Sequence, residues 1–161
     1  MIWGYLITSI KYTEIFSLFL GEVTDFKLLG LDISDAYALM SEYLQKAIRD
    51  PYVRNIFSSV DADDKIQTLT FELKDSSTDD EDFVKTVVSE SMVISWLKPR
   101  VYSLSNTEQF FGGKEQKFYA QANHIAQLSA MLKDKKASVR KIIGDRGYLV
   151  NSYLGDSTSE S

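Results

Sequence analysis

Apolar residues recur at helical spacing along most of this chain, and the pattern predicts a succession of helices. Thr13 is placed to cap the first of them. The apolar face of this helix consists of Ile15, Phe16, Phe19, Leu20 and Val23. A second helix should begin near Ser34 and end before Pro51, because the residue before a proline disfavours helical backbone. Its apolar face consists of Ala36, Leu39, Met40, Tyr43, Leu44, Ala47 and Ile48.

Two longer helices are predicted in the second half of the chain. One should begin at a capping box formed by Thr78 and Glu81, and end at the proline of the Lys98-Pro99 step. The other should run over residues 117–143, with Gly144 placed to end it. Its buried face is expected to comprise Phe118, Ala122, Ile125, Leu128, Leu132, Val139, Ile142 and Ile143.

One short segment, Ile66 to Leu73, alternates apolar and polar residues with the period of a β-strand. Such a strand needs a partner, and two remain open: residues 2–7, or a neighbouring subunit. The chain is therefore predicted to be mainly α, a small bundle of four to five helices with room for a short β-strand arm or hairpin. We expect one helical domain over residues 1–148 and a flexible C-terminal tail over residues 149–161.

Composition removes several classes of function. The 161 residues include no cysteine and one histidine, which excludes a disulfide framework, a thiol nucleophile and zinc sites rich in thiolate or imidazole. The formal charge of −5 argues against a dedicated nucleic-acid binder. The apolar N-terminal stretch lacks a basic start, and Lys11 and Glu14 interrupt it, so we expect folded protein and no membrane span.

Three local patterns could carry chemistry, and each has a simpler structural interpretation. The spacing of Asp61, Asp63 and Glu72 is similar to a calcium loop, but Ile66 occupies the position where the sharp turn requires glycine. His124 has no partner in an ordered catalytic motif, and packing on a helix is the simpler interpretation. The Gly112-Gly113-Lys114 segment lacks the first glycine and the hydroxyl of a phosphate loop, which favours a turn. We therefore predict no catalytic residue, no cofactor and no metal.

Aromatic and charged residues give the best indication of assembly. Phe110 and Phe111 are adjacent in a predicted loop, where both cannot easily turn inward, so at least one is a candidate subunit contact. Residues 61–82 are rich in Asp and Glu, whereas the last helix is basic. Its cations are Lys133, Lys135, Lys136, Arg140, Lys141 and Arg146. These charges are either two solvated helix ends, or opposite faces through which successive subunits meet in a ring.

The segment SMVISWLKPRVYSLSNTEQFFGGKEQKFYAQANHIAQLSAMLKD resembles the C-terminal half of head-to-tail connector, or adaptor, proteins from tailed phages of Gram-positive hosts. The similarity lies in a helix closing on a W-L-x-P turn, a polar loop and the opening of the last helix. It covers about a third of the chain, and residues 55–78 depart from the shorter connection that the family leads us to expect.

The resemblance implies a structural virion protein in the neck, assembled in the host cytoplasm as a homo-oligomeric ring, with twelve copies as the expected number. The implied partners are the portal protein and a downstream neck or tail protein, with DNA only as transient cargo in the channel. Apolar residues in the tail would order against a neighbouring ring. The candidate interface comprises Phe110, Phe111, Lys133, Lys136, Arg140, Tyr148, Leu149 and Tyr153.

Two other classes of function stay open on the sequence. A small helical adaptor or regulatory protein unrelated to virions would use the same surfaces to bind one partner and form no ring. An enzyme would need an acidic site that binds a divalent ion, built from Asp61, Asp63, Asp79 and Asp80.

Overall fold

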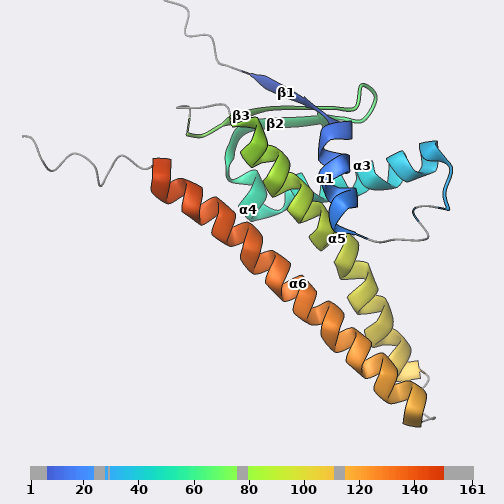
Figure 1. Cartoon of the computed structure of the whole chain (residues 1–161). Helices are drawn as coiled ribbons and strands as arrows, with labels where there is room; N and C mark the ends of the chain where they lie inside the picture. The colour runs from blue at the N-terminus through green and yellow to red at the C-terminus, as the bar shows by residue number, and fades with distance from the viewer. Residues whose placement is uncertain (1–6, 24–27, 29, 76–79, 111–114, 151–161) are drawn as a thin grey trace, which may run out of the picture.

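The computed structural model describes residues 7–23, 28, 30–75, 80–110 and 115–150, with the side chains of 104–121 and 148–150 left out. The described elements are β1 (Thr8–Lys11), α1 (Tyr12–Glu22), α3 (Ile33–Arg49), α4 (Pro51–Arg54), β2 (Phe57–Asp63), β3 (Thr68–Leu73), α5 (Glu81–Phe110) and α6 (Glu115–Val150). A mainly helical fold with a small antiparallel sheet confirms the predicted fold class. Figure 1 shows the sheet at one end and the α5–α6 hairpin extending away from it.

The sheet has the order β1–β3–β2, with both pairs antiparallel. The predicted strand is its centre, and Leu69, Phe71 and Leu73 are buried at every second position. One partner is the N-terminal strand β1, in which Ile10 pairs with Leu69; it begins one residue beyond the arm predicted over residues 2–7. The other partner is β2, which sequence analysis left irregular because its FSSVDAD sequence is mostly polar.

Helix α1 begins one residue before the predicted cap, so the role assigned to Thr13 is wrong. Lys11 occupies the capping position without a side-chain hydrogen bond. The physical reason is that β1 leads directly into α1, and the Tyr12 amide donates to the Gln67 carbonyl at 2.9 Å instead of needing a side-chain cap. Leu20, expected on the buried face, is exposed.

Helix α3 follows the prediction closely, ending at Arg49 before Asp50 and Pro51. The Asp50 carboxylate then accepts a hydrogen bond from the Tyr52 amide at 3.0 Å and caps the single turn of α4. The predicted capping box at the start of α5 involves Thr78, which lies outside the described residues. The observed cap comes from Asp80, which accepts from the Phe83 amide at 3.0 Å.

The prediction that a helix ends at Pro99 is wrong, because α5 continues through this residue to Phe110. Pro99 is exposed, so its ring meets no core packing. On either side of it, Leu97 and Val101 are buried, and this packing holds the helical path across the proline. The Arg100 guanidinium donates to the Trp96 carbonyl at 2.7 Å and lies 4.1 Å from the centre of the Trp96 ring, which adds a local clamp.

Helix α6 begins two residues before the predicted start and passes through Gly144, so the predicted end is also wrong. It extends through Val150, two residues beyond the predicted domain boundary at 148, and residues 151–161 lie outside the described part. Leu132 and Val139 are buried as predicted, and Leu128, Ile142 and Ile143 pack partly buried against the same core. Across the described ranges, no helix has both the length and the apolar composition needed to cross a bilayer.

Replacing Pro99 by Ala should stabilise the protein. Proline removes an amide donor from the interior of α5 and crowds the carbonyl of the preceding turn, so P99A should raise the free energy of unfolding by about 1–3 kcal/mol. Urea unfolding monitored by circular dichroism measures the change. A loss of stability would mean instead that the packing of α5 requires the proline.

Candidate functional site: the basic side of α6

The cations of the last helix divide into two groups, which the sequence pattern could not separate. Lys135 turns inward and donates to Glu90 of α5 at 2.7 Å and to Glu22 at the end of α1. Burial lowers the pKa of Lys135, but the hydrogen bonds to both carboxylates outweigh this and leave the pKa raised. The hydrogen bond from Lys135 in turn lowers the pKa of Glu22. This cluster ties α6 to both α5 and α1.

Arg146 also turns inward, near the end of α6. It donates to Asp75 at 3.0 Å and to Asp80 at 2.6 Å, and its guanidinium lies 4.3 Å from the centre of the Phe83 ring. Its side chain is only 12% exposed. Asp75 and Asp80 belong to the acidic stretch that sequence analysis weighed as a contact for a neighbouring subunit. These acidic and basic side chains therefore pair with each other within one chain and do not require a neighbouring subunit.

The predicted interface residues Lys133, Lys136 and Arg140 form the second group. Within the described part of the chain, neither Lys133 nor Lys136 makes an ion pair, and Lys133 is fully on the surface. The Arg140 guanidinium lies 4.4 Å from the centre of the Tyr52 ring of α4. The structure thus brings Lys136 and Arg140 together at one place and leaves Lys133 outside it.

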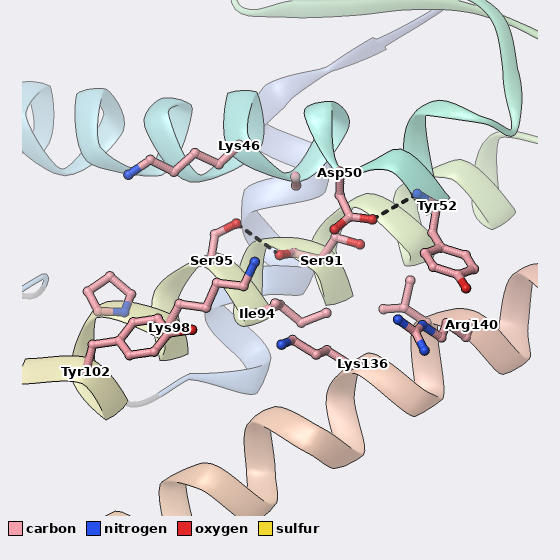
Figure 2. Close-up of a pocket in the computed structure, with 13 residues that line it drawn as sticks. Lys46, Asp50, Tyr52, Ser91, Ile94, Ser95, Lys98, Tyr102, Lys136 and Arg140 are labelled. Carbon is pink, nitrogen blue, oxygen red and sulfur yellow. Dashed lines mark hydrogen bonds between the residues drawn. The ribbon is translucent and has the colours of Figure 1, made fainter. Parts of the chain in front are cut away.

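That place is a pocket of about 470 Å³ between α3, α4, α5 and α6. Its lining consists of Lys46, Ala47, Asp50, Tyr52, Ser91, Ile94, Ser95, Lys98, Pro99, Tyr102, Lys136, Val139 and Arg140. Figure 2 shows the side chains of Lys98, from α5, and Lys136, from α6, both extending into the space between the helices. The pocket therefore has cationic walls on facing helices.

Sequence analysis found only the α6 side of this pocket. Lys46 lies on α3 and Lys98 on α5, helices that also carry other cations, so neither lysine stands out in the sequence. No local signal links these residues, because tertiary packing alone brings the three helices together.

The other predicted interface residues stay predictions. Phe110 is the last residue of α5, and Tyr148 and Leu149 lie in the last turn of α6; the side chains of all three are outside the description. Phe111 and Tyr153 lie outside the described residues altogether. The Gly-Gly-Lys segment at 112–114 also lies outside the described residues.

Two of the carboxylates considered for metal binding, Asp63 and Asp80, have structural partners instead. Asp63 accepts from the Lys65 amide at 2.9 Å and shapes the turn between β2 and β3. Asp64 accepts from the Tyr12 hydroxyl at 2.7 Å, and Asp80 is bound by Arg146. Among the described residues, no group of three or more Asp, Glu, His or Cys side chains is arranged to hold a metal ion; Asp79 lies outside them. His124 is exposed, so its predicted packing role is wrong.

No protein-family model, curated protein or solved structure matches this chain. The geometry of α6 and its pocket is therefore the basis for a functional interpretation, together with the resemblance of the residues that build the hairpin.

Replacing Lys135 by Met should destabilise the fold, because it leaves the carboxylate of Glu90, whose side chain is only 14% exposed, without its cation. We expect a loss of about 1–3 kcal/mol in the free energy of unfolding, since both partners keep some contact with water. Lys133→Met on the same helix is the matched control and should change stability by less than about 0.5 kcal/mol. Urea unfolding of both variants measures the difference; equal effects would contradict the inward assignment of Lys135.

The contribution of this cluster should depend on pH. The folded-state pKa of Glu22 is lowered from 4.5, so its stabilisation is present above that pH and is lost as pH falls through the folded-state value. The folded-state pKa of Lys135 is raised from 10.5, so its stabilisation is present below that pH and is lost at higher pH. The stability difference between wild type and K135M should therefore be widest between these limits. Unfolding measured at pH 7 and pH 3 checks the acid side, and an unchanged difference would contradict the assignment.

Proposed function

We propose that this protein is a structural component of a tailed-phage head-to-tail connector. In this role it forms a homo-oligomeric ring, with twelve copies as the expected number, between the portal protein and a downstream neck or tail protein. It acts in the virion neck after assembly in the host cytoplasm, and DNA passes only as transient cargo. The observation that carries the proposal is the uncovered outer face of α6.

This outer face carries short side chains among its charged ones. Ala126, Ala130 and Ala137 are all exposed, and they recur at spacings of four and seven residues, which places them on one side of the helix. Met131 is also exposed beside them. Short side chains let another helix approach closely, since interaxial distance depends on the residues at the contact. The face is therefore suited to a neighbouring subunit.

A closed ring needs two different surfaces on each subunit, because its contacts are heterologous. A second set of exposed apolar residues lies on α1 and at the start of α3, away from α6 in the chain. It comprises Leu18, Leu20, Leu31 and Ile33. Apolar side chains on separate elements supply the two halves of such a contact. The cations left unpaired on α6 would then help to orient neighbouring subunits and would make their association dependent on salt concentration.

The segment that resembles the connector proteins corresponds to the second half of α5 and the first half of α6. The resemblance therefore falls on the hairpin that carries the proposed contact. The helix departs from the expected pattern in continuing through Pro99. The net charge of −5 also suits a channel component, since a net-acidic protein avoids tight phosphate binding and so lets DNA slide.

Replacing Met131 by Glu should prevent assembly, because it buries an unpaired charge in the proposed contact. Ile66→Glu is the matched control: Ile66 is an exposed apolar residue in the turn between β2 and β3, distant in sequence from the proposed surfaces. Sedimentation velocity over a concentration series, alone and with the portal protein as template, should give a ring for wild type and I66E and a folded monomer for M131E. Wild-type protein that stays monomeric, or forms a twofold dimer, in every condition would contradict the proposal.

A further inference from the structure

We propose that the pocket between α3, α5 and α6 binds a small phosphate monoester, with its phosphate held by Lys98, Lys136 and Ser91. This site goes beyond the connector role and does not depend on it. Three independent features of the pocket point to this ligand: an unpaired hydroxyl, an excess of positive charge, and an apolar lining.

The hydroxyl belongs to Ser91, which is only 3% exposed. Its Oγ has no hydrogen-bond partner in the described structure, whereas two other serines of α5 are satisfied. Ser89 Oγ donates to the Thr86 carbonyl at 3.1 Å, and Ser95 Oγ donates to the Ser91 carbonyl at 3.3 Å. A buried hydroxyl without a partner costs about 1–3 kcal/mol. Ser91 lines the pocket, and a rotamer that turns its hydroxyl into the cavity would let an oxygen of a bound ligand supply that partner.

Positive charge exceeds negative charge at the same place. Four cations line the pocket, namely Lys46, Lys98, Lys136 and Arg140, and Asp50 is the one carboxylate among the lining residues. Lys46 also pairs with Glu42 on its own helix at 2.6 Å. Two positive charges remain after these two carboxylates are counted. Lys98 and Lys136 come from different helices and make no ion pair in the described residues, so an anion bound in the pocket would be attracted to both.

The charge excess selects the class of anion. A phosphate monoester carries close to two negative charges at neutral pH and presents three acceptor oxygens. It therefore matches two unpaired ammonium groups and one hydroxyl donor. A single carboxylate or a phosphodiester of DNA carries one charge and would leave the other cation uncompensated. The monoester is the chemistry that the three donors fit best.

The remaining lining of the pocket is suited to contact the organic group that carries the phosphate. Ala47, Ile94, Pro99 and Val139 are apolar, and the volume of about 470 Å³ lies within the range of small-molecule sites. The Tyr102 side chain is 60% exposed at the pocket, where its ring is available for stacking. A nucleoside monophosphate is a probe with both required parts, and inorganic phosphate is a probe for the anion alone.

Isothermal titration calorimetry of the full chain, in phosphate-free buffer at constant ionic strength, tests the proposal with AMP and inorganic phosphate. Both should bind, and AMP should bind more tightly. Lys136→Gln should raise the Kd for AMP roughly ten-fold or more, since a hydrogen bond to a charged group is lost. Lys133→Gln is the matched control, three residues earlier on the same helix and outside the pocket, and should leave the Kd unchanged. Neither lysine makes an ion pair in the described residues, so both variants should fold.

Ser91→Ala separates a ligand-binding hydroxyl from a merely structural one. Without ligand, S91A should melt at the same or a higher temperature than wild type, because it removes an unpaired buried donor; with AMP, it should show a smaller rise in melting temperature. Ser89→Ala, which loses a hydrogen bond, should lower the melting temperature instead.

Three results would overturn the site. The first is no binding of either probe at millimolar concentration, and the second is an equal loss of binding in K133Q and K136Q. The third is a 20-base-pair duplex without terminal phosphates binding as tightly as AMP and sensitive to both lysines, which would indicate diffuse attraction of phosphate to α6. Each readout concerns the isolated protein, so a failure here leaves the ring proposal unaffected, and a failure to form rings leaves this one unaffected.

Discussion

The attachment of α6 through two inward-facing cations is the constraint on which the rest of the structure depends. Helix α6 packs along α5, and its buried side chains in the described region are Leu132 and Val139. Lys135 and Arg146 add contacts with carboxylates of α1, α5 and the segment before α5. Because these two residues fix the rotation of the helix, they also determine which side chains face outward.

The same rotation produces the two surfaces that carry function in this account. Lys136 follows Lys135 by one residue, and the helical turn of about 100° directs it into the pocket instead of the ion-pair cluster. The short side chains of the outer face lie on a further side of the helix, where α5 does not cover them. A connector subunit and a ligand pocket are therefore compatible on one helix, since they use different faces. Lys135 and Arg146 fix α6 against the other helices, and the cations on its other sides remain available to contact a ligand or another subunit.

Local sequence patterns were sufficient to predict a helix or strand where one of its faces is buried and its flanking residues favour the same boundaries. Helix α3 has seven apolar positions at helical spacing and ends before Pro51, and β3 alternates strictly, so both were predicted from sequence. Local rules failed where tertiary packing outweighed them. Leu97 and Val101 carry α5 across Pro99, and Arg146 holds the last turns of α6 beyond Gly144. β2 was missed because few of its side chains are buried.

The pocket could not be predicted, because its lysines come from three helices that only the fold brings together. Density of charge on the last helix indicated Lys136 and Arg140 but gave no sign that Lys135 and Arg146 turn inward. Single-particle imaging of the protein mixed with the proposed portal partner tests the account most directly. It should reveal a closed ring in which the outer face of α6 contacts the exposed apolar residues of α1 in the next subunit. Particles in which that face remains open to solvent, or a discrete monomer bound to one partner, would contradict the account.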